Sequence, residues 1–186
     1  RLEADLCGLA LSSPVGLAAG LDKNCELMPS LKALGFGYLT VGTITESPRA
    51  GNPKPRMVRL AREQSLINAL GFPNKGLEHA ARMLERTRGR MGGTPVIASI
   101  SGVTPEEIVR CHRRLEPVAD AIEVIISSPN TEGLRVFHNG AALAELLGLV
   151  NDGRTKPLMV KLPPYPAPAT DGSVDPEARE GLLALA

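Results

Sequence analysis

The sequence is poor in aromatic residues and in excess charge. Of its 186 residues, 3% are aromatic and none is tryptophan, and 21 lysines and arginines are balanced by 20 aspartates and glutamates. Sites for single-stranded nucleic acid stack bases on aromatic rings, and a net charge near zero draws neither nucleic acid nor an anionic membrane. We therefore exclude nucleic acid as a partner.

Cysteine and histidine are also sparse, and their spacing does not suggest metal binding. The three cysteines form no CxxC pair and have no histidine at metal-ligand distance along the chain: Cys7, Cys25 and Cys111. The histidines stand equally alone: His79, His112 and His138. We expect no metal site, a reducing cytosol, and structural or surface histidines, with His112 on a solvated helix face among arginines.

Long apolar runs are missing as well. No stretch of 18 apolar residues exists, and the start at Arg1 lacks the pattern of a signal peptide. We expect a soluble chain in the cytoplasm, with peripheral contact to the inner face of the cell membrane if the natural protein has a binding segment upstream of Arg1.

Five apolar runs of strand length are present, at residues 14–19, 38–43, 96–100, 121–126 and 157–162. A strand buried on both faces has this nearly continuous apolar character. The overall apolar content of 43% and charged content of 22% are ordinary for one globular domain. We expect a single domain over residues 1–186.

Helical patterns separate these runs. Thr104, Pro105 and Glu107 form a capping box that opens a helix through residue 115, and Asn139 caps another. Two more helices are expected at residues 76–88 and 29–34. Strands that alternate with helices pair in parallel, so the fold class is α/β.

Three segments lie outside this alternation. The first 13 residues, and residues 57–60 with 66–68, are each expected to form a β-hairpin, the second within an excursion over residues 46–75. A last helix starts at Asp175 and meets no stop signal before Ala186, as in an interrupted chain. Five βα units suit an open doubly wound sheet, or the first part of a (β/α)8 TIM barrel, which needs about 250 residues.

Ligands of α/β folds bind beyond the carboxyl ends of the strands, so those positions are the candidate site. Small residues and Lys23 follow the first run, and two amides and an aromatic side chain lie within residues 67–76. Lys161 stands inside an otherwise apolar strand. A buried lysine without a partner is costly, so Lys161 points to an anionic ligand.

Taken together, these segments resemble dihydroorotate dehydrogenase. The specific pieces are AAGLDKN (18–24), VGTIT (41–45), PRAGNPKPRMVRL (48–60), INALGFPNKG (67–76) and SSPNTEGLR (127–135). The family has a quinone-linked branch and a second branch that has cysteine at the position of Ser128. The AAGLDK sequence and Ser128 resemble the quinone-linked branch. The resemblance implies an FMN-binding TIM barrel, of which this chain supplies about the first five βα units, with a quinone as electron acceptor.

The resemblance also implies roles for individual residues. Ser128 would take the substrate C5 proton and Thr131 would pass it outward. The residues expected at the flavin are Ala19, Gly20, Thr43, Ser99 and Lys161. The residues expected at dihydroorotate or orotate are Lys23, Asn68, Gly71, Phe72 and Asn130.

The chain departs from the family pattern at three places. Ile125 and Ser99 replace asparagines that contact the flavin, and Ser101-Gly102 resembles the cysteine branch. The last three strands, which carry the phosphate clamp, are absent. Alternatives to the dihydroorotate reading are an FMN-barrel oxidoreductase for another pyrimidine-like ring, and an inactive fragment or degenerate homologue.

Overall fold

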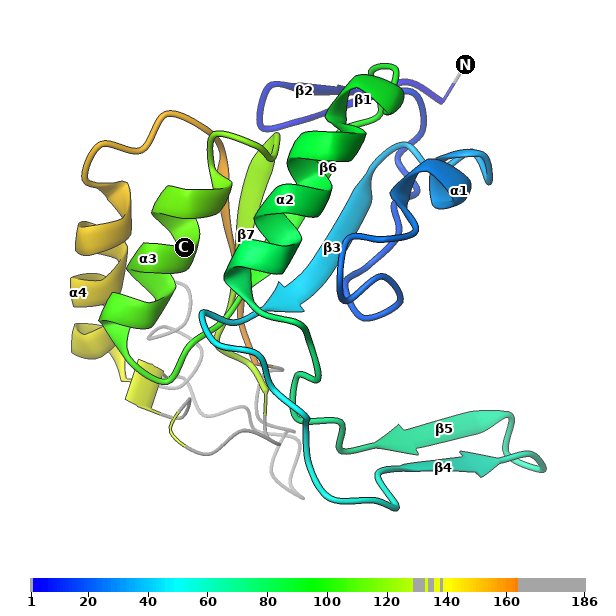
Figure 1. The fold of residues 1–186 in the computed structure, drawn as a ribbon, viewed down its shortest axis with the longest axis vertical. Helices are drawn as coiled ribbons and strands as arrows, with labels where there is room; N and C mark the ends of the chain where they lie inside the picture. Colours follow the sequence, from blue (N-terminus) through cyan, green and yellow to red (C-terminus); the bar gives the residue numbers. More distant parts are fainter. Residues whose placement is uncertain (1, 129–132, 134–135, 138, 164–186) are drawn as a thin grey trace, which may run out of the picture.

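A four-stranded parallel sheet forms the centre of the molecule (Figure 1). The computed structural model describes residues 2–128, 133, 136–137 and 139–163. The strand order is β3-β6-β7-β8, with bounds β3 Leu39–Ile44, β6 Val96–Ile100, β7 Ala121–Ile125 and β8 Leu158–Lys161. Four of the five apolar runs are therefore confirmed as strands, and the expected α/β class is confirmed with them.

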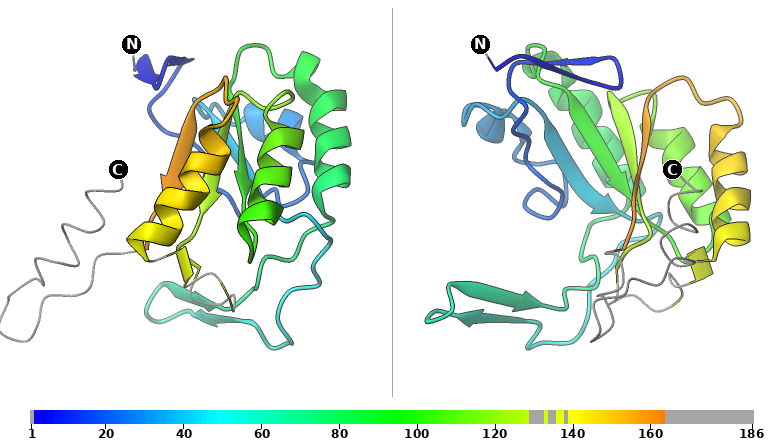
Figure 2. Two further views of the ribbon diagram at one scale, coloured as in Figure 1. Left: turned by 90° about the vertical axis from the view of Figure 1, so that its left-hand side faces the viewer. Right: turned by 180° about the vertical axis from the view of Figure 1, so that it is seen from behind.

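Three helices lie side by side on one face of this sheet (Figures 1 and 2): α2 Leu77–Thr87, α3 Pro105–Leu115 and α4 Gly140–Asn151. Both expected caps are present. The Thr104 hydroxyl accepts a hydrogen bond from the Glu107 amide at 3.3 Å, and the Asn139 side chain accepts one from the Ala141 amide at 2.9 Å. Such caps satisfy amides that have no partner within a helix. A short helix, α1 Met28–Lys32, carries Pro29 in its first turn, and the turn η1 Arg88–Arg90 follows α2.

The two faces of the sheet have different roles. Side chains alternate along a strand, so Val41, Ala98 and Val124 point toward the helices and join the main apolar core. The residues between them point to the opposite face, which we call the inner face. Ser99 and Glu123 lie directly opposite each other there, on neighbouring strands.

Residues 14–19 differ from the expectation of a regular strand. A single parallel bridge joins Leu17 to Leu39, supported by hydrogen bonds from the Leu17 amide to the Tyr38 carbonyl at 3.1 Å and from the Thr40 amide to the Leu17 carbonyl at 2.8 Å. The approach is so close that a Cβ at Gly16 would lie 2.1 Å from the Tyr38 ring. Gly16 permits this close approach, and the chain continues alongside β3 as far as the hydrogen bond from the Gly42 amide to the Asp22 carbonyl.

Both expected hairpins are confirmed, at opposite ends of the sheet (Figures 1 and 2). Strands β1 Ala4–Leu6 and β2 Leu9–Leu11 pair in antiparallel fashion near the amino ends of the parallel strands. Strands β4 Met57–Leu60 and β5 Ser65–Asn68 form the second hairpin, which projects beyond the carboxyl ends. The excursion therefore lies at the edge of the sheet where ligands bind in this fold class.

The expectation that His112 lies on a solvated helix face is wrong. Its side chain is 3% exposed, and its Nε2 atom has no hydrogen-bond partner in the part of the chain that the structure describes. Helix α3 packs against both α2 and α4, and His112 is one of its buried residues, with Ile108, Cys111 and Leu115. Burial lowers the pKa of the His112 imidazole below its ordinary value.

No helix among the described residues is long and apolar enough to cross a bilayer.

Candidate active site

A cavity of about 330 Å³ lies at the carboxyl ends of the parallel strands. The residues expected at a flavin that line it are Ala19, Gly20, Thr43 and Lys161. The residues expected at the substrate that line it are Lys23, Asn68, Gly71 and Phe72, and Ser128 lines it as well. Asn130 and Thr131 lie outside the described residues. The structure thus brings together side chains from five separate segments, in a volume typical of small-molecule sites.

One wall is the loop that carries Lys23. The Gly20 amide donates to the Gly42 carbonyl, and the Gly42 amide donates to the Asp22 carbonyl, both at 2.9 Å, which ties the loop to β3. Gly42 has a φ of 106°, and a Cβ there would come within 2.5 Å of the Ser99 carbonyl. Only glycine fits this crossing without displacement of β6.

A buried aspartate fixes the same loop from behind. The Asp22 carboxylate, 2% exposed, accepts hydrogen bonds from the Glu26 amide at 2.9 Å and the Leu27 amide at 2.8 Å. The Lys23 ammonium, which is half-buried, donates to the Gly20 carbonyl. Lys23 therefore holds a positive charge at the cavity rim on a loop that its neighbours have already ordered.

The opposite wall depends on Asn74, whose role the sequence did not reveal. Its side chain is buried and donates to the Thr45 hydroxyl and to the Phe72 carbonyl, each at 2.8 Å. It also accepts from the Gly76 amide at 2.8 Å. Of the two amides expected to suit a planar ligand, Asn68 lines the cavity, whereas Asn74 holds the loop in shape.

Phe72 and Gly71 depend on this support because both have positive φ, 54° and 69° respectively. A Cβ at Gly71 would lie 2.4 Å from the Asn52 side-chain oxygen. The Asn52 amide nitrogen in turn donates to the Ala69 carbonyl at 3.0 Å. The backbone of this wall is therefore held in a conformation that glycine accepts and other residues resist.

An ion cluster joins the two walls at the surface. Glu26 accepts from the Lys75 ammonium at 2.6 Å and from His79 Nε2 at 2.9 Å, and the Lys75 amide donates to Asn24 at 3.0 Å. The hydrogen bond from Lys75 holds the pKa of the Glu26 carboxyl below its ordinary value. Exposed pairs of this kind contribute little stability, so the cluster serves mainly to align the loops.

Ser99 does not line the cavity. It is fully buried on β6, and its hydroxyl lies 3.2 Å from the Thr43 hydroxyl, so it supports a cavity residue from beneath. Ser101, the next inner-face residue of the same segment, donates to the Ile125 carbonyl at 3.0 Å. Ser99 and Ser101, where the sequence departs from the family pattern, therefore form hydrogen bonds within the protein.

Ile125 lies in the cavity itself, with Ser128 and Lys161. It is 6% exposed and presents an apolar surface where an asparagine was expected. A ligand that reaches this position meets no hydrogen-bond donor or acceptor from that side chain. The substitution therefore changes the recognition surface of the site.

The expectation that Lys161 is buried is wrong. The side chain is exposed, because β8 is the outermost strand of the described sheet and has a strand neighbour only on its β7 side. Lys161 nevertheless lines the cavity, directly across from Ile125 in the strand register. Its position favours an anionic ligand, although the argument from burial does not hold.

Sequence reasoning missed Glu123. This residue precedes Ile125 by two positions on β7 and so points to the same inner face. Its Oε1 atom is buried and has no hydrogen-bond partner among the described residues. The signal was present in the sequence, because Glu123 interrupts an apolar strand in the same way as Lys161 does.

The cavity residues suit a flavin. Ala19 and Gly20 have no bulky side chain on their side of the cavity, and a Cβ added at Gly20 would meet nothing within 4 Å. A flat ring system can therefore approach the backbone there. Thr43 offers a hydroxyl and Lys161 an ammonium, which match the acceptor edge of such a ring.

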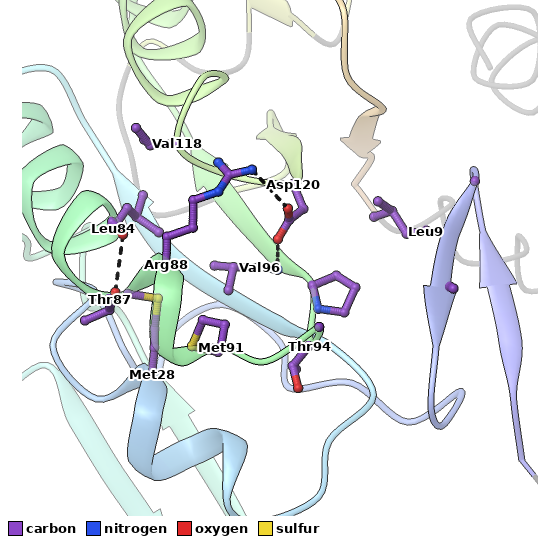
Figure 3. A pocket seen from close by; sticks show the side chains of 14 residues that line it. Leu9, Met28, Leu84, Thr87, Arg88, Met91, Thr94, Val96, Val118 and Asp120 are labelled. Carbon is purple, nitrogen blue, oxygen red and sulfur yellow. Dashed lines mark hydrogen bonds and ion pairs between the residues drawn. The ribbon is translucent and has the colours of Figure 1, made fainter.

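A second cavity of about 390 Å³ lies at the amino ends of the strands, beside the β1–β2 hairpin (Figure 3). Its charged groups already bind protein atoms: Asp120 accepts from the Val96 amide at 2.8 Å and pairs with Arg88 at 3.8 Å. Arg88 also donates to the Pro117 carbonyl at 2.9 Å. Since these groups serve the fold, we assign ligand binding to the smaller cavity.

Comparison with known proteins gives the same picture. The family model for dihydroorotate dehydrogenase matches residues 1–182. A dihydroorotate dehydrogenase (quinone) of Thermus thermophilus is 39% identical over 100% of this chain and 54% of the relative, and that of Stenotrophomonas maltophilia is 41% identical over 96% and 54%. The chain spans about half the length of these curated relatives.

Solved structures agree in fold. The ligand-free DHODH of Eimeria tenella superposes with a TM-score of 0.86 at 29% identity, over 99% of this chain and 58% of that protein. The same enzyme in complex with ferulenol gives a TM-score of 0.83. The match therefore extends over nearly the whole chain both in sequence and in fold, and this chain belongs to the dihydroorotate dehydrogenase family.

Proposed function

We propose that the full-length protein oxidises dihydroorotate to orotate with FMN as its cofactor and passes the electrons to a quinone. The observation that carries the proposal is the single cavity in which Lys23, Asn68, Ser128 and Lys161 converge. The quinone follows from the relatives named above. Residues 1–186 would form part of one barrel domain, since the relatives are nearly twice as long.

The substrate would lie against the two ordered walls. Lys23 pairs with the carboxylate of dihydroorotate, because its ammonium is held at the rim by the loop that Asp22 orders. Asn68 donates to and accepts from the pyrimidine ring, as an amide can do both. Gly71 and Phe72 shape the pocket, and Asn130 would act on the ring beside Asn68.

Ser128 would remove the C5 proton of the substrate. It follows β7 closely and lines the cavity, so its hydroxyl is held near the ring. An isolated serine is a weak base, and a path that carries the proton onward makes it effective. We assign that role to Thr131 together with a water molecule.

A bound FMN would supply the acceptor for the hydride that leaves C6 of the substrate. Ala19 and Gly20 provide the flat surface that the ring needs, and Thr43 and Lys161 bind its polar edge. The Lys161 ammonium stabilises negative charge that develops there. Ser99 holds the Thr43 hydroxyl in place, at 3.2 Å.

Ile125 supports a second candidate, oxidation of another pyrimidine-like ring. An apolar side chain in the cavity contributes no hydrogen bond to the substrate, and loss of polar contacts weakens discrimination between related rings. The carboxylate partner Lys23 favours dihydroorotate over rings that lack an acidic group.

Anaerobic mixing of the full-length protein with dihydroorotate tests the proposal. We expect a yellow protein with one FMN per chain, whose absorbance bleaches with dihydroorotate and recovers with a soluble quinone. Dihydrouracil, which lacks the carboxylate, should bleach it far more slowly, and Lys23→Ala should remove most of this preference. Faster bleaching by dihydrouracil would favour the second candidate, and a colourless protein would refute both.

The location proposed from the sequence is the cytoplasm, with peripheral contact to the inner face of the membrane where the quinone resides. The three cysteines support a reducing compartment, because all are free thiols and two of them, Cys25 and Cys111, are buried. Burial raises the pKa of the Cys111 thiol to about 12, so it remains protonated and inert.

A further inference from the structure

The four strands of the central sheet contain just two charged residues, Glu123 on β7 and Lys161 on β8. The two strands are neighbours in the sheet. In their register Glu123 lies opposite Met159, and Ile125 lies opposite Lys161. Because side chains alternate along a strand, Glu123 and Lys161 both point to the inner face, as diagonal neighbours.

The residues directly across from Glu123 on the two neighbouring strands leave its Oε1 atom unpaired. Met159, directly across on β8, has no hydrogen to donate. Ser99, directly across on β6, has its hydroxyl 3.2 Å from that of Thr43. Glu123 Oε1 is buried without a partner among the described residues, and such an atom is costly to leave unpaired.

Lys161 is the charged residue of the described sheet whose side chain can extend toward it. Diagonal neighbours on adjacent strands lie about 7–8 Å apart at the backbone, within the span of a long side chain. The Lys161 side chain is exposed toward the cavity, so an ammonium placed over Ile125 can bend down toward Glu123. The pair would join a charge beneath the cavity to a charge within it.

We propose that Glu123 is a positioning residue for Lys161: its carboxylate accepts hydrogen bonds from the ammonium and holds it against the floor of the cavity. The part of the inference that concerns flavin rests on the proposed function, whereas the pair itself does not. Glu123 would act through Lys161 and touch neither cofactor nor substrate.

A double-mutant cycle with Glu123→Gln and Lys161→Met in the full-length protein tests the pair. Glutamine preserves the size of the side chain and removes its charge, and methionine does the same for lysine. The readouts are the dissociation constant of FMN, from flavin fluorescence, and the midpoint potential of the bound flavin. Glu145→Gln, at an exposed carboxylate on α4, is the matched control.

The expected result is strong coupling. Lys161→Met should weaken FMN binding about tenfold in the wild-type background but less than about threefold beside Glu123→Gln, as contacting residues behave. It should lower the flavin potential in the wild-type background and hardly change it in the glutamine background. Equal effects of Lys161→Met in both backgrounds would overturn the proposal, since a merely structural glutamate leaves the lysine in place.

A further measurement separates this inference from the proposed function. If the wild-type protein binds no FMN, the proposed function fails, and the same four proteins are compared by urea unfolding. Non-additive losses of stability would then still support the pair, and additive losses would refute it. A Glu123→Gln variant that changes neither FMN binding nor stability would also refute it, because the carboxylate would then contribute nothing to the position of Lys161.

Discussion

Asn74 offers the sharpest test of how the site is built. Its side chain is 7% exposed and makes three hydrogen bonds of 2.8 Å, to the Thr45 hydroxyl, the Phe72 carbonyl and the Gly76 amide. We expect Asn74→Ala to break all three together. At about 1 kcal/mol for each bond, the loss of unfolding free energy is about 3 kcal/mol.

For a domain of this size that loss corresponds to a fall in Tm of roughly 6–12 °C, measurable by circular dichroism. The substrate wall should suffer as well, because Phe72 has a φ of 54° and relies on Asn74 to keep its carbonyl in place. Orotate affinity should therefore fall more than FMN affinity, since the expected flavin contacts lie on other segments.

The matched control is Asn24→Ala. Asn24 accepts a single hydrogen bond from the Lys75 amide, at 3.0 Å and exposed to solvent, so its loss should cost less than about 1 kcal/mol. If Asn74→Ala costs no more than this control, or if it weakens FMN and orotate equally, the reasoning about the wall is incorrect.

Three further predictions concern the chemistry and the core. Ser128→Ala should slow flavin reduction by about 100- to 10,000-fold while orotate affinity changes little, with Ser127→Ala as the control, and equal losses in both would indicate damaged packing. Ile125→Asn should tighten orotate binding about fivefold if its amide gains one hydrogen bond of about 1 kcal/mol, and unchanged or weaker binding in a flavin-absorbance titration would indicate a different ring as substrate. Burial lowers the pKa of His112 from 6.5, so the unfolded chain takes up a proton first as pH falls below 6.5 and stability declines there. In urea unfolding between about pH 6.5 and 5, His112→Gln should show a smaller decline than wild type, and parallel curves would contradict the assignment.

Local signals predicted the elements of this fold well. Residues 96–100 were expected as a strand and form one over the same span, because a short apolar run between turns has few other solutions. Thr104 was expected as a cap and accepts the Glu107 amide, since capping depends on residues three apart. Such features need no knowledge of the rest of the molecule.

Features that depend on tertiary neighbours were missed. His112 lies among arginines in the helix pattern, yet it is buried in the folded protein. Lys161 was expected to be buried by its strand, but exposure depends on what lies beyond β8. Asn74 looked like a ligand amide because the sequence does not reveal that Thr45 and Gly76 stand within its reach.

The sequence indicated which residues line the cavity, but it did not indicate how they are arranged in space. The motif that contains Ser128 and the one that contains Lys23 lie about a hundred residues apart, and only the parallel topology explains why they share a cavity. Glu123, by contrast, could have been predicted from the sequence. Like Lys161, it is a charged residue within an apolar strand, and it lies on the preceding strand.

The bridge between Leu17 and Leu39 has a consequence for self-association. The backbone of residues 15–22 occupies the outer side of β3 and bonds to it as far as Gly42, so this margin of the sheet is closed to another strand. A sheet with two open margins can add copies without limit, whereas one with a single open margin stops once two copies have met. Association through the central sheet should therefore not proceed to filaments, because the margin at β3 is already occupied.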